Sequence, residues 1–324
     1  MKTGIKKFSV DEESMYDLNT YTGRLYHFSR MTDMRLISLK ENKLNSYLNL
    51  LENYKSNPQN FNLENSEINN ELWKARYGIR SAINSETGKI LPIYARMCAF
   101  VPVNIPIAFG LMCLPVTKFN ILAFNTLNQC YNAMMNYANG SGTADSLKYT
   151  ILSFGLAVSS SVGVGLFLKN KFSRTQTQNI SLFKEVLIRT FPSCVAGFLN
   201  IFFMRSDYFV KGIYVKDESG KNIGISKICG AKAVLEGGLS RFVLPMPLIL
   251  NHFILKGINR YPFGKNIKIA IELSLLGVAL GFGLPCSIAF FKQNSKVSSY
   301  LLEKELKEIA DKQGIEYVFY NKGL

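Results

Sequence analysis

One run of twenty residues without a charged side chain, Met97–Val116 (MCAFVPVNIPIAFGLMCLPV), constrains this chain more than any other feature. Arg96 and Lys118 flank the run. Twenty helical residues rise about 30 Å, which is the thickness of the hydrocarbon core of a bilayer. The run therefore predicts a helix that crosses a membrane.

Pro102, Asn104 and Pro106 interrupt this run. Because proline lacks an N–H group, we expect the backbone carbonyls of Cys98 and Pro102 to lose their helical donors. Unpaired carbonyls are costly in lipid, so such a helix must pack against protein or line a wet cavity. Asn104 is either a substrate-binding amide or a side chain that is hydrogen-bonded across the bundle at a kink. The pattern favours a transporter or channel over a simple anchor.

Four further apolar runs predict spans, at about 149–168, 186–204, 237–255 and 269–291. The fold class is therefore an all-α membrane protein with about five transmembrane helices. The chain carries 38 Lys and Arg against 23 Asp and Glu, a net charge of +15. Many of the basic residues lie just outside the apolar runs. This placement favours a lipid bilayer with anionic headgroups as partner and argues against nucleic acid.

The segment 119–138 is also uncharged, but it repeats asparagine at steps of three and four. The resulting stripe comprises Asn125, Asn128, Asn132, Asn136 and Asn139, with Gln129 beside it. This spacing places the amides on one face of a helix that is either membrane-embedded or interfacial. Amides both donate and accept hydrogen bonds, so the stripe suits the two ends of a zwitterion. The alternative is hydrogen bonding between helices.

Composition divides the chain into a helical, membrane-peripheral segment (1–95), a transmembrane domain (96–292) and a short polar tail (293–324). A hydrophilic hairpin loop at about 205–236 interrupts the transmembrane domain, with its turn at Asp217–Gly220.

Three polar helices are expected outside the spans. One follows a capping box at Ser38–Glu41, a second covers about 65–82, and a third covers about 297–312 and is stopped by Gly314. The remaining residues, IEYVFY, predict a strand.

No catalytic motif and no spaced Cys/His cluster is found, and no metal, cofactor or enzymatic activity is expected. The six cysteines form no CxxC pair and are interpreted as small buried hydrophobic residues. The N-terminal region carries Asp11, Glu12 and Glu13 without an apolar stretch, so any organelle targeting should be internal.

Five segments resemble, in the same order, the sideroflexin family of mitochondrial inner-membrane proteins. They are YTGRLYHFSRMTDMR (21–35), ETGKILPIYARMCAFVPVNIPIAFGLM (86–112), NQCYNAMMNYANGSG (128–142), GIYVKDESGKNIGISKICGAKAV (212–234) and YNKGL (320–324). The resemblance implies a multi-pass protein of the mitochondrial inner membrane that moves a small neutral amino acid, above all serine, into one-carbon metabolism.

Residues and resemblance together give a candidate substrate path and a candidate gate. The path comprises Pro102, Asn104, Pro106, Asn128, Gln129, Asn132, Asn136 and Tyr137. The gate comprises Glu86, Thr87, Gly88, Lys89 and Arg96.

The gate departs from the family pattern. Where the family typically has His-Pro-Asp-Thr-Gly-Glu, this chain has Asn84-Ser85-Glu86-Thr87-Gly88-Lys89. At least one family member with a degraded element is associated with respiratory-complex assembly. The alternative function is therefore a membrane scaffold that binds membrane-protein partners and transports nothing.

Overall fold

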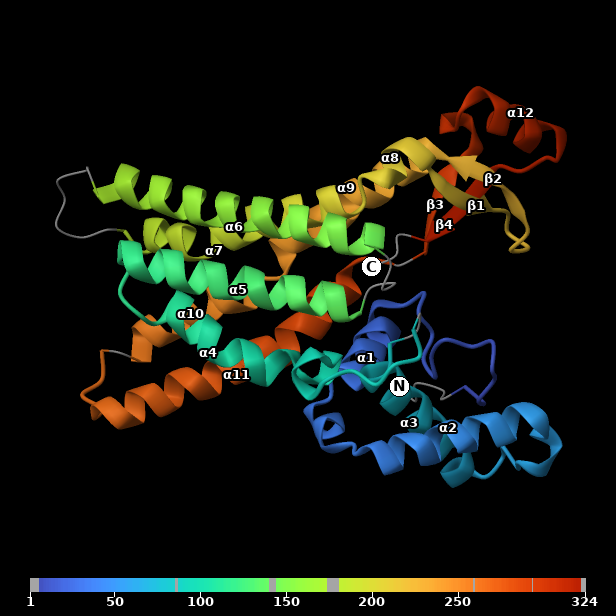
Figure 1. Cartoon of the computed structure of the whole chain (residues 1–324), viewed down its shortest axis with the longest axis horizontal. Coiled ribbons are helices and arrows are strands. Elements are labelled where there is room, and N and C mark those ends of the chain that lie inside the picture. The colour runs from blue at the N-terminus through green and yellow to red at the C-terminus, as the bar shows by residue number, and fades with distance from the viewer. Residues whose placement is uncertain are drawn as a thin grey trace. The chain divides into compact units, whose positions relative to one another are not determined.

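The computed structural model describes residues 6–84, 87–139, 144–173, 181–258, 260–292 and 294–321, and it is mostly helical, as the predicted fold class requires (Figure 1). The chain forms two compact units. The first comprises Met1–Pro115, Cys130–Leu147 and Pro247–Phe290, and the second comprises Val116–Gln129, Lys148–Met246 and Phe291–Leu324. The two units are interleaved along the chain.

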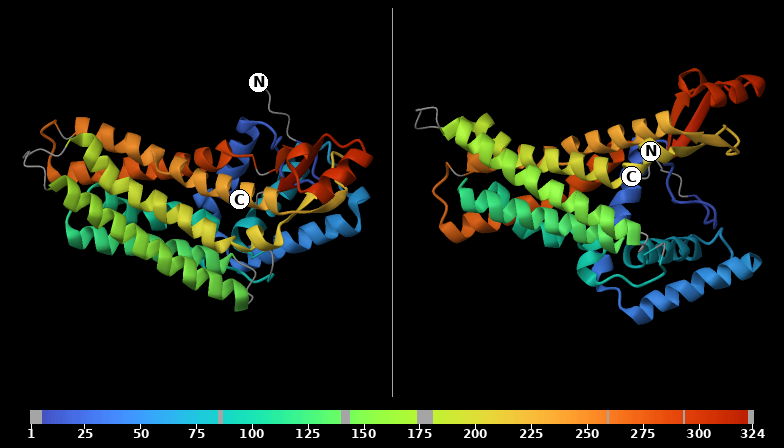
Figure 2. Two further views of the ribbon diagram at one scale, coloured as in Figure 1. Left: turned by 90° about the horizontal axis from the view of Figure 1, so that it is seen from above. Right: turned by 45° about the horizontal axis from the view of Figure 1, so that its top comes forward.

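The first unit begins with three helices, α1 (Tyr21–Met31), α2 (Glu41–Ser56) and α3 (Ser66–Ala82). Short 3-10 turns, η1 (Met34–Ser38) and η2 (Pro58–Asn60), connect them. The helices α2 and α3 lie side by side (Figure 2).

The start of α3 agrees with the sequence, since the side chain of Asn65 caps it by accepting from the backbone N–H of Glu67 at 2.9 Å. The predicted capping box of α2 is wrong. Ser38 belongs to η1, and its hydroxyl donates to the carbonyl of Arg35 at 2.9 Å. The helix begins after Lys40, which provides no side-chain cap.

An aromatic core holds this helical segment together, and it consists of Phe8, Met15, Tyr16, Tyr54, Leu72, Trp73 and Tyr77. A buried polar chain adjoins it. The Tyr77 hydroxyl lies 3.1 Å from Nδ1 of His27 and 3.2 Å from Oγ of Ser14. Burial lowers the pKa of His27 to about 4, and the positive charge of Arg80 acts in the same direction.

The rest of the first unit contains η3 (Ile93–Ala95), η4 (Met97–Ala99), α4 (Phe100–Met112), α10 (Met246–Ile258) and α11 (Lys265–Phe290). Helix α1 packs on the C-terminal end of α11. The buried guanidinium of Arg24 donates through Nε to the carbonyl of Ala289 at 2.7 Å, and through Nη1 to the carbonyls of Leu18 and Asn19. A cation at this position satisfies a terminal carbonyl and complements the helix dipole.

The helix α5 (Lys118–Ala138) contributes to both units and confirms the predicted helix at 119–138. The second unit also contains α6 (Ala144–Ser173), α7 (Leu182–Met204), the short α8 (Asp207–Lys211) and α9 (Lys227–Val243).

A four-stranded antiparallel sheet completes the second unit, with strand order β2-β1-β4-β3. The strands are β1 (Ile213–Lys216), β2 (Asn222–Ser226), β3 (Asn294–Ser298) and β4 (Tyr317–Asn321). The predicted hairpin is confirmed, and Gly220 in its turn adopts φ of +85°. The hairpin is not an isolated loop, because Lys216 of β1 pairs with Phe319 of β4.

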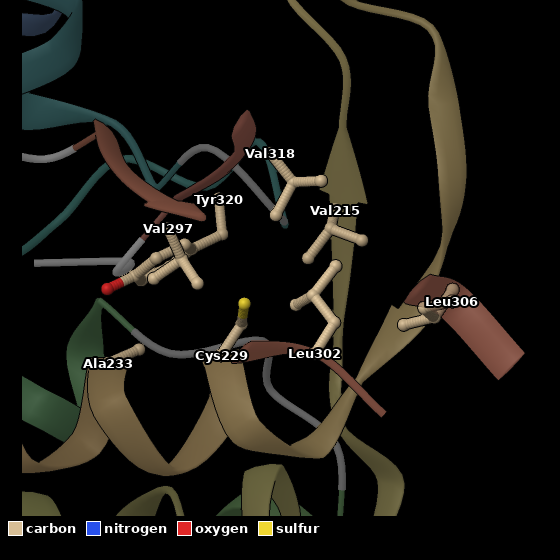
Figure 3. Close-up of a cluster of buried hydrophobic side chains, with 8 residues drawn as sticks. All are labelled: Val215, Cys229, Ala233, Val297, Leu302, Leu306, Val318 and Tyr320. Carbon is tan, nitrogen blue, oxygen red and sulfur yellow. The ribbon is translucent and has the colours of Figure 1, made fainter. Parts of the chain in front are cut away.

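The sheet packs its inner face on the start of α9 and on the tail (Figure 3). The buried cluster comprises Val215, Cys229, Ala233, Val297, Leu302, Leu306, Val318 and Tyr320. The predicted tail helix starts too early: residues 294–298 form β3, η5 (Ser299–Leu301) follows, and α12 covers only Lys304–Lys312. The tail strand is confirmed, while residues 322–324 of the YNKGL motif lie outside the described residues.

Four helical elements of the described chain are long and apolar enough to cross a membrane: Leu147–Phe172, Leu182–Met204, Lys227–Ile258 and Lys265–Phe290. They correspond to the second to fifth predicted spans. The element Lys227–Ile258 is broken, since α9 ends at Val243 and α10 begins at Met246. Pro245 and Pro247 lie at this break and cannot continue the backbone ladder.

The first predicted span is shorter than its sequence suggests. Its helical part runs from Met97 to Met112 and ends four residues before Val116. Sixteen helical residues rise about 24 Å, less than the hydrocarbon core of a typical bilayer.

The cysteine prediction holds in part. All six thiols are free; Cys98, Cys194 and Cys229 are buried, but Cys130 is exposed.

The buried His27 predicts a pH-dependent stability. Its pKa lies below the ordinary value of 6.5, so the unfolded chain binds one more proton than the folded chain between pH 6.5 and about 4. Stability should therefore be complete above pH 6.5 and fall by about 3 kcal/mol as the pH drops to 4. Thermal unfolding of the purified protein in detergent, measured from pH 7.5 to 4.5, checks this.

The variant His27→Gln supplies the control, because it has no titratable group at this position. Its stability should fall less between pH 6.5 and 4.5 than that of the wild type. Identical slopes for both proteins would contradict the assignment.

Candidate functional site

Asn104 lies in the middle of an apolar helix contact. Val101, Asn104, Ala108 and Met112 recur at steps of three and four and form the buried face of α4. This face packs on α11, and its cluster includes Leu276 and Leu280. Asn104 itself is only 5% exposed. The amide of Asn104 thus lies on a buried helix face whose other side chains, Val101, Ala108 and Met112, are apolar.

The amide of Asn104 bonds to its own helix, with Nδ2 donating to the carbonyl of Phe100 at 2.8 Å. The effect of the prolines differs from the prediction. Only Pro106 lies in the helix interior, where it removes the donor for the carbonyl of Pro102. Because α4 begins at Phe100, Pro102 falls in the first turn, where an N–H would have no helical acceptor. The expected loss at Cys98 is therefore wrong.

The stripe on α5 is not uniform in burial. Asn125 and Gln129 are 2% and 1% exposed, Asn128, Asn132 and Asn136 are half-buried, and Tyr137 is 56% exposed. Asn125 bonds in two directions: Nδ2 donates to the carbonyl of Ile121 at 2.9 Å, and Oδ1 accepts from the hydroxyl of Ser161 on α6 at 2.7 Å. For Asn125, the structure supports the alternative of hydrogen bonding between helices.

Three contacts join the C-terminal half of α5 to the 84–96 loop, which precedes α4. Nδ2 of Asn84 donates to the carbonyl of Ala138 at 2.8 Å, and Nδ2 of Asn139 donates to that of Ala95 at 3.3 Å. The hydroxyl of Tyr131 donates to the carbonyl of Tyr94 at 3.4 Å, and its ring centroid lies 6.0 Å from that of Phe100. The structure thus brings together two segments that the sequence proposes separately as gate and path.

Asn84 organises the loop, although it is absent from the predicted site. Its Oδ1 accepts from the N–H of Thr87 at 2.9 Å, and its backbone exchanges bonds with Gly88 and Lys89. A bridge between Ile83 and Ile90 closes the turn. The signal in the sequence was an asparagine two residues before a Glu-Thr-Gly turn, a position at which an amide commonly bonds nearby backbone.

The other predicted gate residues differ in their surroundings. Thr87, Gly88 and Lys89 are exposed, and Gly88 adopts φ of +67°. Glu86 lies outside the described residues. Arg96 is buried, and it donates to the carbonyls of Leu91 at 3.2 Å and Leu39 at 2.9 Å. Through these bonds Arg96 holds the backbone of the loop at Leu91 and connects it to the backbone at Leu39. Pro102 and Pro106 are exposed, on the face of α4 opposite Asn104.

Asn84→Ala should loosen this loop, because it removes both a donor and an acceptor from a buried position, at a cost of about 1–3 kcal/mol. Trypsin cleavage after the exposed Lys89 should become several-fold faster in the purified protein. Asn62→Ala is the matched control, since Asn62 also accepts from a nearby backbone N–H, that of Glu64, but is exposed. Equal cleavage rates for wild type and Asn84→Ala would contradict the role of Asn84.

Comparisons with known proteins agree with this architecture. The family model described as sideroflexins matches residues 11–324. A sideroflexin of Dictyostelium discoideum is 30% identical over 95% of both chains. Sideroflexin-1 of Mus musculus is 29% identical over 97% of both chains, and human sideroflexin-5 is 30% identical over 95% of this chain and 91% of its own length. No solved structure matches the chain.

The match covers almost the whole chain, including the candidate site and the sheet. Together with the spans, it supports a transporter-type membrane role in general terms. This multi-pass membrane protein belongs to the sideroflexin family.

Proposed function

We propose that this protein transports a small neutral amino acid, with serine as the first candidate, across the mitochondrial inner membrane. In this role it would feed one-carbon metabolism. Family membership and the four helical elements of spanning length among the described residues support a transporter-type role. The identity of the substrate and the location in the mitochondrial inner membrane are what we propose beyond this general role.

The observation that carries the proposal is Asn104. A polar side chain at membrane depth is costly and commonly marks a binding site or pathway. Because Nδ2 is engaged with the carbonyl of Phe100, the group that would meet a substrate is Oδ1, which can accept from an ammonium or a hydroxyl group. The carbonyl of Pro102, whose helical donor Pro106 removes, is a further acceptor, at a residue on the face of α4 opposite Asn104.

The stripe on α5 supplies further polar contacts without a buried charge. The half-buried Asn128, Asn132 and Asn136 continue it along the helix. In the proposed mechanism these amides bind the zwitterion by hydrogen bonds, one after another, as it moves along α5. The 84–96 loop, which is bonded to the end of α5, controls the entry of the substrate into this path.

Radiolabelled serine uptake into proteoliposomes tests the function. We expect uptake by the wild type and at least a tenfold loss in Asn104→Leu and Asn132→Leu, because each variant removes an amide and adds no charge. Asn62→Leu, in the exposed N-terminal segment, should transport as the wild type does. Expression and reconstitution of all four proteins are compared by immunoblot.

Two results would count against the proposal. Equal uptake in all variants would remove these amides from the path, and no uptake of any small neutral amino acid by the wild type would remove the function.

The second candidate is a membrane scaffold or assembly factor for respiratory-chain complexes. The altered element at 84–89 and the outer face of the sheet favour it. On that face Tyr214 and Ile225 pair across β1 and β2 and are 63% and 48% exposed. Stable co-purification of membrane-protein partners that is lost in Tyr214→Ser, with proteoliposomes inert to amino acids, would establish this function instead.

A further inference from the structure

The helices α7 and α9 pack against each other. Two glycines permit this approach. A Cβ on Gly238 would lie 2.7 Å from the ring of Phe198, and one on Gly197 would lie 3.1–3.5 Å from the aliphatic carbons of Arg241. The stem of Arg241 therefore lies against the backbone of α7.

This places an arginine well inside a candidate span. Arg241 is the fifteenth residue of α9, about 21 Å along the helix from Lys227. Gly197 is seven residues before the end of α7. Two aromatic rings lie nearby, because Phe198 contacts Gly238 on the same helix as Arg241 and its ring centroid is 6.3 Å from that of Phe242.

Within the described residues, Arg241 makes no hydrogen bond and no ion pair. The acids of α7 and α9 are Glu185 and Glu236. Glu185 pairs with Arg189 at 2.8 Å. Glu236 is five residues from Arg241, which places it on a different face of α9, and it acts electrostatically on Tyr320 of the sheet.

Two ordinary explanations for this arginine fail. A basic residue in the last turn often bonds the terminal carbonyls of its helix, but Arg241 donates to none of them. A neighbouring acid could neutralise it, but the nearby charge that acts on Arg241 is that of Arg205, which has the same sign. An intramembrane cation without a partner is costly, and it gains most from an anion that binds beside it.

We propose that Arg241 is the anchor of an oxyanion-binding site between α7 and α9. Its guanidinium presents planar N–H donors that match a carboxylate or a phosphate. The break between α9 and α10, three residues beyond Arg241, fits this role, because interrupted helices commonly border binding sites in transporters. Two sources share the chemistry: the carboxylate of a carried amino acid and the phosphate of an anionic lipid.

Thermal unfolding of the full-length protein in detergent tests the site independently of transport. Acetate or phosphate should raise the unfolding midpoint of the wild type by about 2–4 °C relative to chloride at equal ionic strength. Arg241→Met should abolish this rise. In chloride the Arg241→Met variant should be at least as stable as the wild type, because it removes an unpaired charge. A purely structural role of Arg241 would instead make the variant less stable in chloride.

Two further variants control for charge and packing. Arg241→Lys keeps the positive charge but loses the planar donors, so we expect it to retain only part of the rise. Lys232→Met removes one cation from the same helix nine residues earlier and should respond to oxyanions as the wild type does.

Two arms identify the source of the oxyanion. Serine is compared with serine methyl ester, which lacks the carboxylate, and nanodiscs of phosphatidylglycerol are compared with nanodiscs of phosphatidylcholine. Protection by serine alone assigns a carried carboxylate, and protection by phosphatidylglycerol assigns a lipid phosphate. Either result supports the site, even if the uptake assay shows no transport.

Two outcomes would overturn the proposal. One is a wild-type midpoint that is the same in chloride, acetate, phosphate, serine and phosphatidylglycerol. The other is an Arg241→Met variant that loses stability in chloride yet keeps the full response to oxyanions.

Discussion

Polar groups at membrane depth must find their partners within the protein, and this structure meets that constraint with asparagine. Asn104, Asn125 and Asn139 all donate through Nδ2 to the carbonyl four residues earlier in the chain. Each amide nitrogen is thereby held by the chain one turn earlier, which leaves the amide oxygen as the acceptor. Asn125 shows the result, because its Oδ1 accepts from Ser161 of α6. An amide held in this way keeps its oxygen as an acceptor, which the proposed transport of a small amino acid would use.

Local signals in the sequence predict much of the fold. The cap at Asn65, the turn at Asp217–Gly220 and the stop at Gly314, where φ is +66°, each depend on nearby residues alone. The two errors have different causes. Residues 294–298 form a strand because the distant β4 pairs with them, whereas Ser38 joins η1 through a local bond to the carbonyl of Arg35. No periodicity within either segment carries that information.

The sequence proposes members of the candidate site but not the contacts between them. Asparagine spacing and proline placement single out Asn104 and the stripe as candidates, because amides and prolines are unusual in apolar runs. Asn84 and Arg96 could not be assigned their roles in this way. Their partners are backbone carbonyls of Ala138, Leu91 and Leu39, and a carbonyl is present at every position of a chain. Arg241 is a different case. The sequence shows an arginine in an apolar run, but only the structure shows that neither α7 nor α9 gives it a hydrogen bond or an ion pair.

The pairing of β3 with β4 and of β4 with β1 carries a topological consequence. All four strands belong to one sheet, so the end of β2 at Ser226 and the start of β3 at Asn294 must lie on the same side of the membrane. The intervening chain must then cross an even number of times. It contains two elements of spanning length, Lys227–Ile258 and Lys265–Phe290, which satisfies this parity. The broken element and α11 therefore cross together or not at all, and β3 can join the sheet only after both have been synthesised.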